Sequence, residues 1–337
     1  MRIEATAVTI SWIPSESVGG PLKAGFDLRL SHYDSPPPDH LDGVGQVREL
    51  RDADAFRFAN VLAVWADVED GQVRAHGVTP DTGLAMGATT VRVAGVGATF
   101  QAASLPVLRR EPEALADGGV RYVQTVGGRT GVPLPRPVPH APFVRWQAPT
   151  VWTTVAVDVH PDGSTGVELL GASPFPRHWL YAPSGDLVAK SVVTDQATWM
   201  NHAFGPRTPW HDEDRAAHVH PVESALEHEL SVTIMRGGTA PTVRRLAEGD
   251  TLTRQGEPGD ALFLVLDGVL RVDVDGRAVA EVGPGAVLGE RALLEGGTRS
   301  STLVATTPVR VAEAAADAID LDRLRELAEG HHREEIA

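Results

Sequence analysis

Short runs of alternating apolar residues, separated by Gly and Pro turn signals, recur along most of this chain. Asp70-Gly71 and Asp162-Gly163 each lie between two such runs. An Asp-Gly pair in that setting favours a two-residue β-hairpin turn, because both positions tolerate a positive φ. The 34 glycines, 25 prolines and low aromatic content (5%) agree with many turns and short strands. The sequence therefore predicts a mainly β protein.

The first two-thirds of the chain carries most of these hairpin signals. We expect hairpins turning at Asp70-Gly71, at Asp162-Gly163 and around Ser184-Gly185, and a further strand pair over residues 89–100. A helix is expected over residues 46–51. Residues 126–142 are so rich in Gly and Pro that they predict a long loop, or a link between two halves of this region.

Aromatic residues divide the chain into two regions. All seven Trp and all three Tyr precede residue 211, and only Phe263 follows it. A chain of 337 residues is long enough for two domains, and the two regions must fill their cores with different side chains. We predict a β-rich domain over residues 1–228 and a second domain over 229–337. Pro221 is expected in the first turn of a helix that runs to Leu230 at this boundary.

Charge and cysteine content exclude several functions. The net charge of −15 disfavours a general nucleic-acid binder and docking on anionic lipid, which both need a basic face. The chain has no cysteine, which excludes disulfides, thiolate metal sites and cysteine nucleophiles. The N-terminus alternates like a strand, and no apolar run is long enough to span a membrane. We expect a cytoplasmic protein, and the strong excess of arginine over lysine suggests a bacterial one.

From residue 246 the strands become shorter and the turns more regular. Glycines mark turns between runs such as ALFLVL and VLRVDV, which is typical of a small β-barrel or jelly roll. The tail over residues 315–330 has helical spacing and is expected to pack on this barrel.

Within this region, the stretch GERALLEGGTRSSTL (residues 289–303) places an acid and an arginine on either side of a short helical run. Unpaired N–H groups at the start of a helix suit an anionic oxygen. The planar guanidinium of Arg299 can hold two phosphate oxygens, whereas the carboxylate of Glu290 accepts from hydroxyls and fits a sugar. Together these groups predict a pocket for a nucleotide with a compact phosphate.

On these residues the region over about 243–329 resembles the cyclic nucleotide-binding domain, the module of catabolite activator protein and protein kinase A regulatory subunits. The spacing from Gly289-Glu290 to Arg299 matches the phosphate-binding cassette of that family. The resemblance implies that Glu290, helped by the backbone of Gly289, takes the ribose 2′-hydroxyl and that Arg299 pairs with the cyclic phosphate. It further implies N–H donors at Ala292 and Ser300. Arg291 and Thr298 depart from the family pattern, which usually has an apolar residue and often a proline there.

The resemblance implies a cAMP or cGMP ligand and a regulatory protein that acts on its N-terminal domain or on a protein partner, or that self-associates. The segment after the barrel is short and acidic, so direct DNA recognition is not expected. Two alternatives remain open: a nucleotide-regulated enzyme with its active site in residues 1–228, and a scaffold with a structural barrel.

The N-terminal region carries two weaker signals. His211, His218 and His220 lie among acidic residues and are metal-ligand types, although an acidic loop before a helix explains them equally well. Arg177, His178 and Trp179 follow two prolines and could line a pocket, or could form a packed edge strand in which proline blocks pairing. We predict no metal site and no catalytic residue.

Overall fold

The computed structural model divides the chain into two compact units, Met1–Val219 and His220–Ala337. Each unit is described by itself, and the domain boundary expected after residue 228 stays a prediction. The structure describes residues 1–19, 23–24, 26, 33–93, 96–137, 143–191, 194, 208–211, 219–221, 230, 234–235, 241–294, 297–315 and 325.

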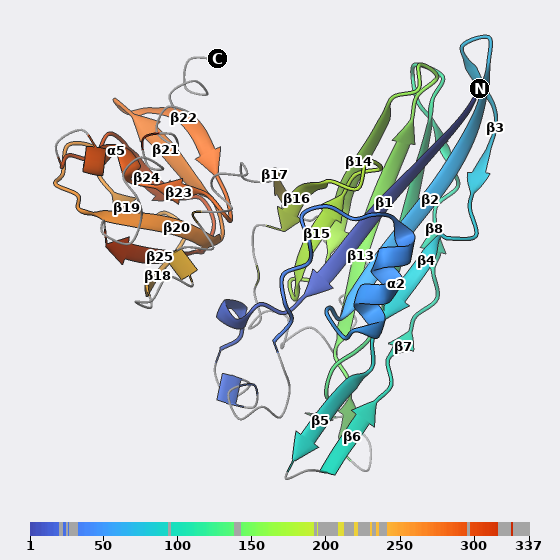
Figure 1. Ribbon diagram of the computed structural model, residues 1–337, viewed down its shortest axis with the longest axis horizontal. Coiled ribbons are helices and arrows are strands. Elements are labelled where there is room, and N and C mark those ends of the chain that lie inside the picture. The colour runs from blue at the N-terminus through green and yellow to red at the C-terminus, as the bar shows by residue number, and fades with distance from the viewer. Residues whose placement is uncertain are drawn as a thin grey trace. The chain divides into compact units, whose positions relative to one another are not determined.

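Two antiparallel sheets face each other in the N-terminal unit (Figure 1). The seven-stranded sheet contains, in spatial order, β17 (Val219–Pro221), β16 (Leu187–Ser191), β15 (Arg177–Tyr181), β1 (Arg2–Trp12), β2 (Phe58–Glu69) and β3 (Gln72–Val78), with β4 (Gly83–Met86) also paired to β2. The six-stranded sheet contains β14 (Thr165–Ala172), β13 (Thr150–Val159) and β10 (Val120–Arg129), with β7 (Ala103–Ser104), β8 (Leu108–Arg109) and β9 (Glu113–Ala114) along the outer edge of β10.

Smaller elements lie between these strands along the chain. They are η1 (Ser15–Ser17), α2 (Val44–Asp52), η2 (Pro209–His211) and two two-stranded hairpins, β5 (Thr89–Val93) with β6 (Val96–Phe100) and β11 (Leu134–Pro137) with β12 (Val144–Gln147). The predicted helix over residues 46–51 is confirmed as part of α2.

The predicted hairpins form as expected. Strands β2 and β3 join at Asp70-Gly71, where φ is 53° and 69°, so both turn residues have the left-handed backbone that this dipeptide tolerates. Strands β13 and β14 join through Asp162-Gly163, and β15 and β16 join through Ser184-Gly185. The pair over residues 89–100 is β5 and β6. Local turn chemistry therefore sets much of this unit's topology.

The expected loop is wrong for residues 126–129, which continue β10, and for residues 134–137, which form β11. Residues 138–142 lie outside the described residues, and a division of this region into two halves stays a prediction. The glycines in β10 serve close packing and do not interrupt the strand. A Cβ at Gly127 would lie 2.5 Å from the Trp210 ring, and one at Gly128 would lie 2.5 Å from Met86 Sδ. Glycine inside a strand often marks such a close approach.

Two further expectations are also wrong. The edge strand proposed around His178 is β15, which lies inside its sheet between β1 and β16; the prolines precede the strand and so do not block pairing. Pro221 ends strand β17 and does not begin a helix. The rest of the helix expected up to Leu230, apart from Leu230 itself, lies outside the described residues.

The core of the N-terminal unit follows from strand alternation. Every second residue of β1 and β2 faces the other sheet, so Ala5, Ala7, Leu62 and Val64 pack against residues of β10 and β13. The buried side chain of Asn60 on β2 also forms hydrogen bonds to the other sheet. Asn60 Oδ1 accepts from Gln124 Nε2 at 2.9 Å, and Asn60 Nδ2 donates to the Thr153 carbonyl at 3.2 Å. Because these buried groups are hydrogen-bonded, they favour one pairing of the sheets over shifted ones.

The C-terminal unit contains two four-stranded antiparallel sheets. One has the order β18 (Thr242–Leu246), β25 (Val309–Ala315), β20 (Ala261–Asp267) and β23 (Val287–Leu288); the other has β19 (Thr251–Thr253), β24 (Thr302–Ala305), β21 (Leu270–Val274) and β22 (Arg277–Val282). The predicted strands ALFLVL and VLRVDV are confirmed as β20 and β21. The β-barrel or jelly-roll fold is confirmed as a barrel-like pair of sheets that do not close.

One aliphatic core lies between these two sheets. Phe263 and Val265 of β20 and Val311 of β25 meet Leu270 and Leu303 of the other sheet. The outer face of β20 is covered as well, because Leu262 and Leu264 pack with Leu230 and Ile234. Both faces of β20 are thus buried, which makes it the central strand of the unit. The tail helix expected over residues 315–330 lies outside the described residues, apart from residues 315 and 325.

Candidate functional site

The stretch from residue 287 to residue 294 has the expected local structure. Strand β23 ends at Leu288, Gly289 turns the chain with a φ of 93°, and α5 (Glu290–Leu294) follows. A left-handed backbone is inexpensive for glycine and strained for other residues. Gly289 thus allows the abrupt change from strand to helix that brings Glu290 to the start of α5.

Backbone pairing fixes the position of Arg299. Its N–H donates to the Glu257 carbonyl at 2.8 Å, and its carbonyl accepts from the Gly256 N–H at 2.9 Å. One further bond, from the Gly259 N–H to the Gly297 carbonyl at 2.8 Å, extends this pairing. The segment 256–259 is therefore a template that holds Arg299 next to strand β20.

The side chain of Arg299 is buried at 8% exposure. Its Nη1 donates to the Ala261 carbonyl at 2.9 Å, and its Cζ lies 5.0 Å from the centroid of the Phe263 ring. Burial lowers the pKa of Arg299, while the carboxylates of Asp260, Glu313 and Glu290 act in the opposite direction. In the part of the chain that the structure describes, none of those carboxylates comes within 4.0 Å of the guanidinium. Arg299 is thus a buried cation without a direct counter-ion there.

Two glycines leave the space that Arg299 occupies. A Cβ on Gly259 would lie 2.0 Å from Arg299 Nε, and a Cβ on Gly289 would lie 2.5 Å from Nη1. The guanidinium therefore lies directly against the backbone of both residues. The position of the guanidinium also explains why glycine occupies both residues 259 and 289, which are far apart in sequence: a side chain at either one would overlap Arg299.

Changing Gly259 to Ala should displace the Arg299 side chain without unfolding the unit. Gly259 has no positive φ, and the atoms that the new methyl meets belong to a flexible side chain. We expect nucleotide affinity to fall about tenfold or more, as for loss of a charged hydrogen bond, while the melting temperature changes little. Calorimetry and a thermal melt measure the two quantities. Gly83→Ala, where a Cβ would have open space, is the control. Unchanged affinity in Gly259→Ala would contradict the claim that Gly259 leaves the space in which Arg299 binds the nucleotide.

The other predicted site residues lie on α5 or next to Arg299 in sequence. Glu290 is buried at 4% exposure, and its charge acts on the pKa of Arg299. Ala292 is buried, with its carbonyl accepting from the Gly297 N–H at 2.7 Å, and Ser300 is half-buried. Arg291 is half-buried at the start of α5. Glu290 and Arg299, with eight residues between them in sequence, are thus close enough in the fold for the charge of Glu290 to act on the Arg299 guanidinium.

Sequence reasoning missed the residues that position Arg299. Gly259, Ala261 and Phe263 come from a segment about forty residues upstream, and none of them carries a charge that would single it out. The available signal was the Gly-Asp pair immediately before strand β20. A glycine at the start of a buried strand indicates a close approach of another group.

His178 of the N-terminal unit is a buried structural residue. It is 1% exposed, and its Nε2 lies 2.7 Å from the Ser173 carbonyl, so this nitrogen carries the proton. The Ser11 hydroxyl then donates to Nδ1 at 2.6 Å. Burial lowers the pKa of His178 to about 4, opposed in part by the bond to Ser173. The imidazole is therefore neutral at physiological pH and satisfied on both nitrogens.

The buried state of His178 predicts a pH dependence of stability. An unfolded histidine takes up a proton below its ordinary pKa of 6.5, whereas the folded one resists protonation until about pH 4. The unfolded state binds more protons in this window, so stability falls as the pH is lowered from 6.5 to 4, by on the order of 3 kcal/mol. Denaturant unfolding across this pH range should show that the free energy of unfolding falls less steeply for His178→Gln than for the wild type. Identical slopes in both proteins would contradict the assignment.

The side chains of the metal-ligand candidates lie outside what the structure describes. His218 lies outside the described residues, and for His211 and His220 only the backbone is described, in η2 and β17. Among the residues that are described, no group of three or more His, Asp or Glu side chains could hold a metal ion.

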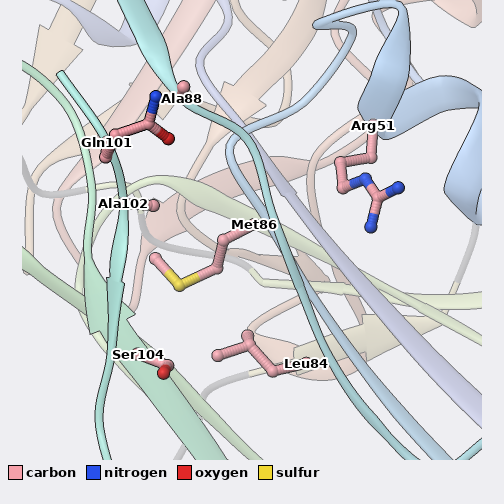
Figure 2. Close-up of a pocket in the computed structure, with 7 residues that line it drawn as sticks. All are labelled: Arg51, Leu84, Met86, Ala88, Gln101, Ala102 and Ser104. Atoms are coloured by element: carbon pink, nitrogen blue, oxygen red, sulfur yellow. The ribbon is translucent and has the colours of Figure 1, made fainter.

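Two cavities lie on the N-terminal unit. One, of about 260 Å³, is lined by residues of α2 and β4 and by residues on either side of the β5–β6 hairpin, among them Arg51 and Met86 (Figure 2). The other, of about 430 Å³, lies beside Tyr181, His40 and Gly185. Neither of these two cavities is lined by His178. No helix among the described residues is long and apolar enough to cross a membrane.

Comparison with known proteins identifies the C-terminal unit. Residues 243–322 match the family model of the cyclic nucleotide-binding domain. A cyclic nucleotide-gated potassium channel of Mesorhizobium japonicum is 39% identical over 89 residues, which are 26% of this chain and 24% of the channel. A cAMP-dependent protein kinase regulatory subunit of Yarrowia lipolytica is 35% identical over 65 residues, 19% of this chain and 17% of that protein.

Among solved structures, a cyclic nucleotide-binding domain from Methylobacillus flagellatus is 25% identical, with a TM-score of 0.27, over 33% of this chain and 79% of that one. The chain therefore matches only about a quarter or less of the two full-length relatives. The resemblance that the cassette residues suggested is confirmed: the C-terminal third of this chain contains a domain of the cyclic nucleotide-binding family, at residues 243–322.

Proposed function

We propose that the C-terminal unit captures cAMP or cGMP and that the protein is a cyclic nucleotide sensor. The observation that carries this proposal is the buried Arg299, held by Ala261 and the two glycines without a direct carboxylate partner in the described structure. A buried charge without a partner is costly, so such a site favours an incoming anion. The match of residues 243–322 to the cyclic nucleotide-binding family supports a nucleotide as its source.

In this proposal Arg299 pairs with the cyclic phosphate and Glu290 accepts from the ribose 2′-hydroxyl. Gly289, Ala292 and Ser300 supply backbone N–H groups. Incoming phosphate charge would offset the burial that lowers the pKa of Arg299. The buried Glu290 carboxylate acts on Arg299 through its charge; in this proposal it disfavours a second anionic group in the ligand and accepts from neutral hydroxyls.

Nucleotide capture acts on the rest of the protein through a difference in affinity between two states. The phosphate-binding cassette (residues 289–302) begins directly after β23, and β23 pairs with β20. The outer face of β20 also contacts Leu230 and Ile234. A change at the cassette can therefore reach the segment that precedes the domain. We propose that this segment relays ligand binding to the N-terminal unit or to a protein partner, and that the protein does not read DNA itself.

Hydrogen–deuterium exchange with and without cAMP or cGMP tests this proposal. We expect slower exchange over residues 287–302, and a second change in the segment around Leu230 or in the N-terminal unit. Slower exchange confined to residues 287–302 would support the binding site but contradict the proposal that the segment around Leu230 transmits the effect of binding. Unchanged exchange over residues 287–302 at saturating concentrations of both nucleotides would contradict the binding site itself.

A further inference from the structure

Two β-hairpins leave the same end of the N-terminal unit. The β5–β6 hairpin follows β4, whose last residue, Met86, pairs with the first residue of β2. The β11–β12 hairpin follows β10, whose last residues pair with β7 just after β6. A hydrogen bond joins the bases of the two hairpins: Thr130 Oγ1 donates to the Gly87 carbonyl at 3.4 Å. Figure 1 shows β5 and β6 extending past the two sheets, at the end of the unit opposite the chain's N-terminus.

The β11–β12 hairpin, which we call the docking hairpin (residues 134–137 and 143–147), exposes large apolar side chains. Trp146 is 68% exposed, Phe143 64% and Val144 46%. Val144 and Trp146 are two residues apart on β12, so they share one face of the hairpin. A two-stranded hairpin has little stability of its own, and a cluster of exposed aromatic groups commonly marks a contact surface. The docking hairpin therefore has the features of a contact element.

Each of the two hairpins lies in a stretch of sequence that contains no acidic residue. Residues 82–110 and 118–157 contain seven arginines and neither Asp nor Glu, in a chain with 45 acidic residues and a net charge of −15. Arg136 and Arg145 are direct partners across the docking hairpin. An acidic surface would be complementary in charge to these stretches.

We propose that the docking hairpin binds a second copy of this chain. All 45 acidic residues lie outside the two acid-free stretches, so another copy offers the complementary charge on the rest of its surface. Phe143, Val144 and Trp146 supply the apolar centre of the contact, and the arginines supply its charged rim.

Sedimentation velocity of the full-length protein at low and high salt tests this proposal. We expect the wild type to sediment as a dimer or larger assembly at low salt, and to dissociate partly at high salt because the contact is partly electrostatic. Trp146→Ala and the double variant Arg136→Glu/Arg145→Glu should each weaken association about tenfold or more, as for a central interface residue. Their melting temperatures should stay close to that of the monomeric wild type, because Trp146 lies outside the core.

Two matched controls come from β22 of the C-terminal unit. Val279→Ala removes an exposed apolar side chain, and Arg277→Glu reverses an exposed charge; both should leave the assembly unchanged. A wild type that is monomeric at every concentration and salt would overturn the proposal, and so would an assembly that survives both docking-hairpin changes. Binding of the monomer to phosphatidylserine vesicles, lost in Trp146→Ala, would assign the hairpin to lipid and also overturn it.

Discussion

Replacing Arg299 with Ala should abolish most cyclic nucleotide affinity. The guanidinium is buried, donates to the Ala261 carbonyl and lies over Phe263, so it is positioned before any ligand arrives. Removing one partner of a buried charge pair costs about 2–5 kcal/mol, which corresponds to a loss of about 30-fold or more. The ligand-induced rise in melting temperature measures this, since stabilisation by a ligand depends on its concentration relative to Kd.

Arg277→Ala is the matched control, because Arg277 is an exposed arginine on the same unit. It should keep the full ligand-induced shift. The assignment of Arg299 is refuted if the Arg299→Ala protein shows the same shift as the wild type at each nucleotide concentration. A variant that melts cooperatively but no longer responds to nucleotide is the result we expect.

The second large effect is expected in the N-terminal unit, where Asp34→Ala should destabilise the fold strongly. Arg57 Nη2 lies 2.8 Å from Asp34 Oδ1, and the two side chains are 4% and 0% exposed. Asp34 Oδ2 also accepts from the Ile13 N–H at 2.7 Å. Arg57 Nη1 also lies 3.6 Å from Oδ1 of Asp54, whose side chain is 37% exposed. Removing the closer, buried carboxylate leaves the buried Arg57 charge with this longer contact, which costs up to about 3–5 kcal/mol. Urea unfolding followed by tryptophan fluorescence measures the loss, because all seven Trp precede residue 211.

Asp81→Ala provides the comparison for this change. Asp81 forms an ion pair with Arg48 at the same 2.8 Å, but both side chains are 56% exposed. An exposed pair contributes about 0–1 kcal/mol, so this variant should unfold close to the wild type. Equal destabilisation by the two changes would show that burial does not govern the energy of these pairs.

Much of the fold could be predicted from the sequence, because its hairpins are encoded in local turn chemistry. At Asp70-Gly71 both residues have a positive φ, and at Asp162-Gly163 the glycine has one (φ 95°), a conformation that favours these residue types; both hairpins turn there. The errors came from residues whose role is set by distant contacts. Gly127 and Gly128 look like breakers in sequence, but they stay in strand β10 because Trp210 and Met86 occupy the space of their missing side chains.

The candidate site was predictable only in part, for a similar reason. Glu290 and Arg299 carry charge and lie close in sequence, so their relation to a sugar and a phosphate can be inferred from chemistry. The groups that hold Arg299, at Gly259, Ala261 and Phe263, come from another strand and have no distinctive chemistry. In the N-terminal unit, the buried partners of His178 come from β1 and from the segment before β15, which no local pattern connects.

A calorimetric titration of the full-length protein with cAMP, and separately with cGMP, tests the central claim most directly. The proposed site at Glu290 and Arg299 predicts saturable binding of at least one of the two nucleotides with one site per chain, and loss of that heat in Arg299→Ala. Absence of binding heat for both nucleotides in the folded wild type, measured at two temperatures so that an accidental zero enthalpy is excluded, would contradict it.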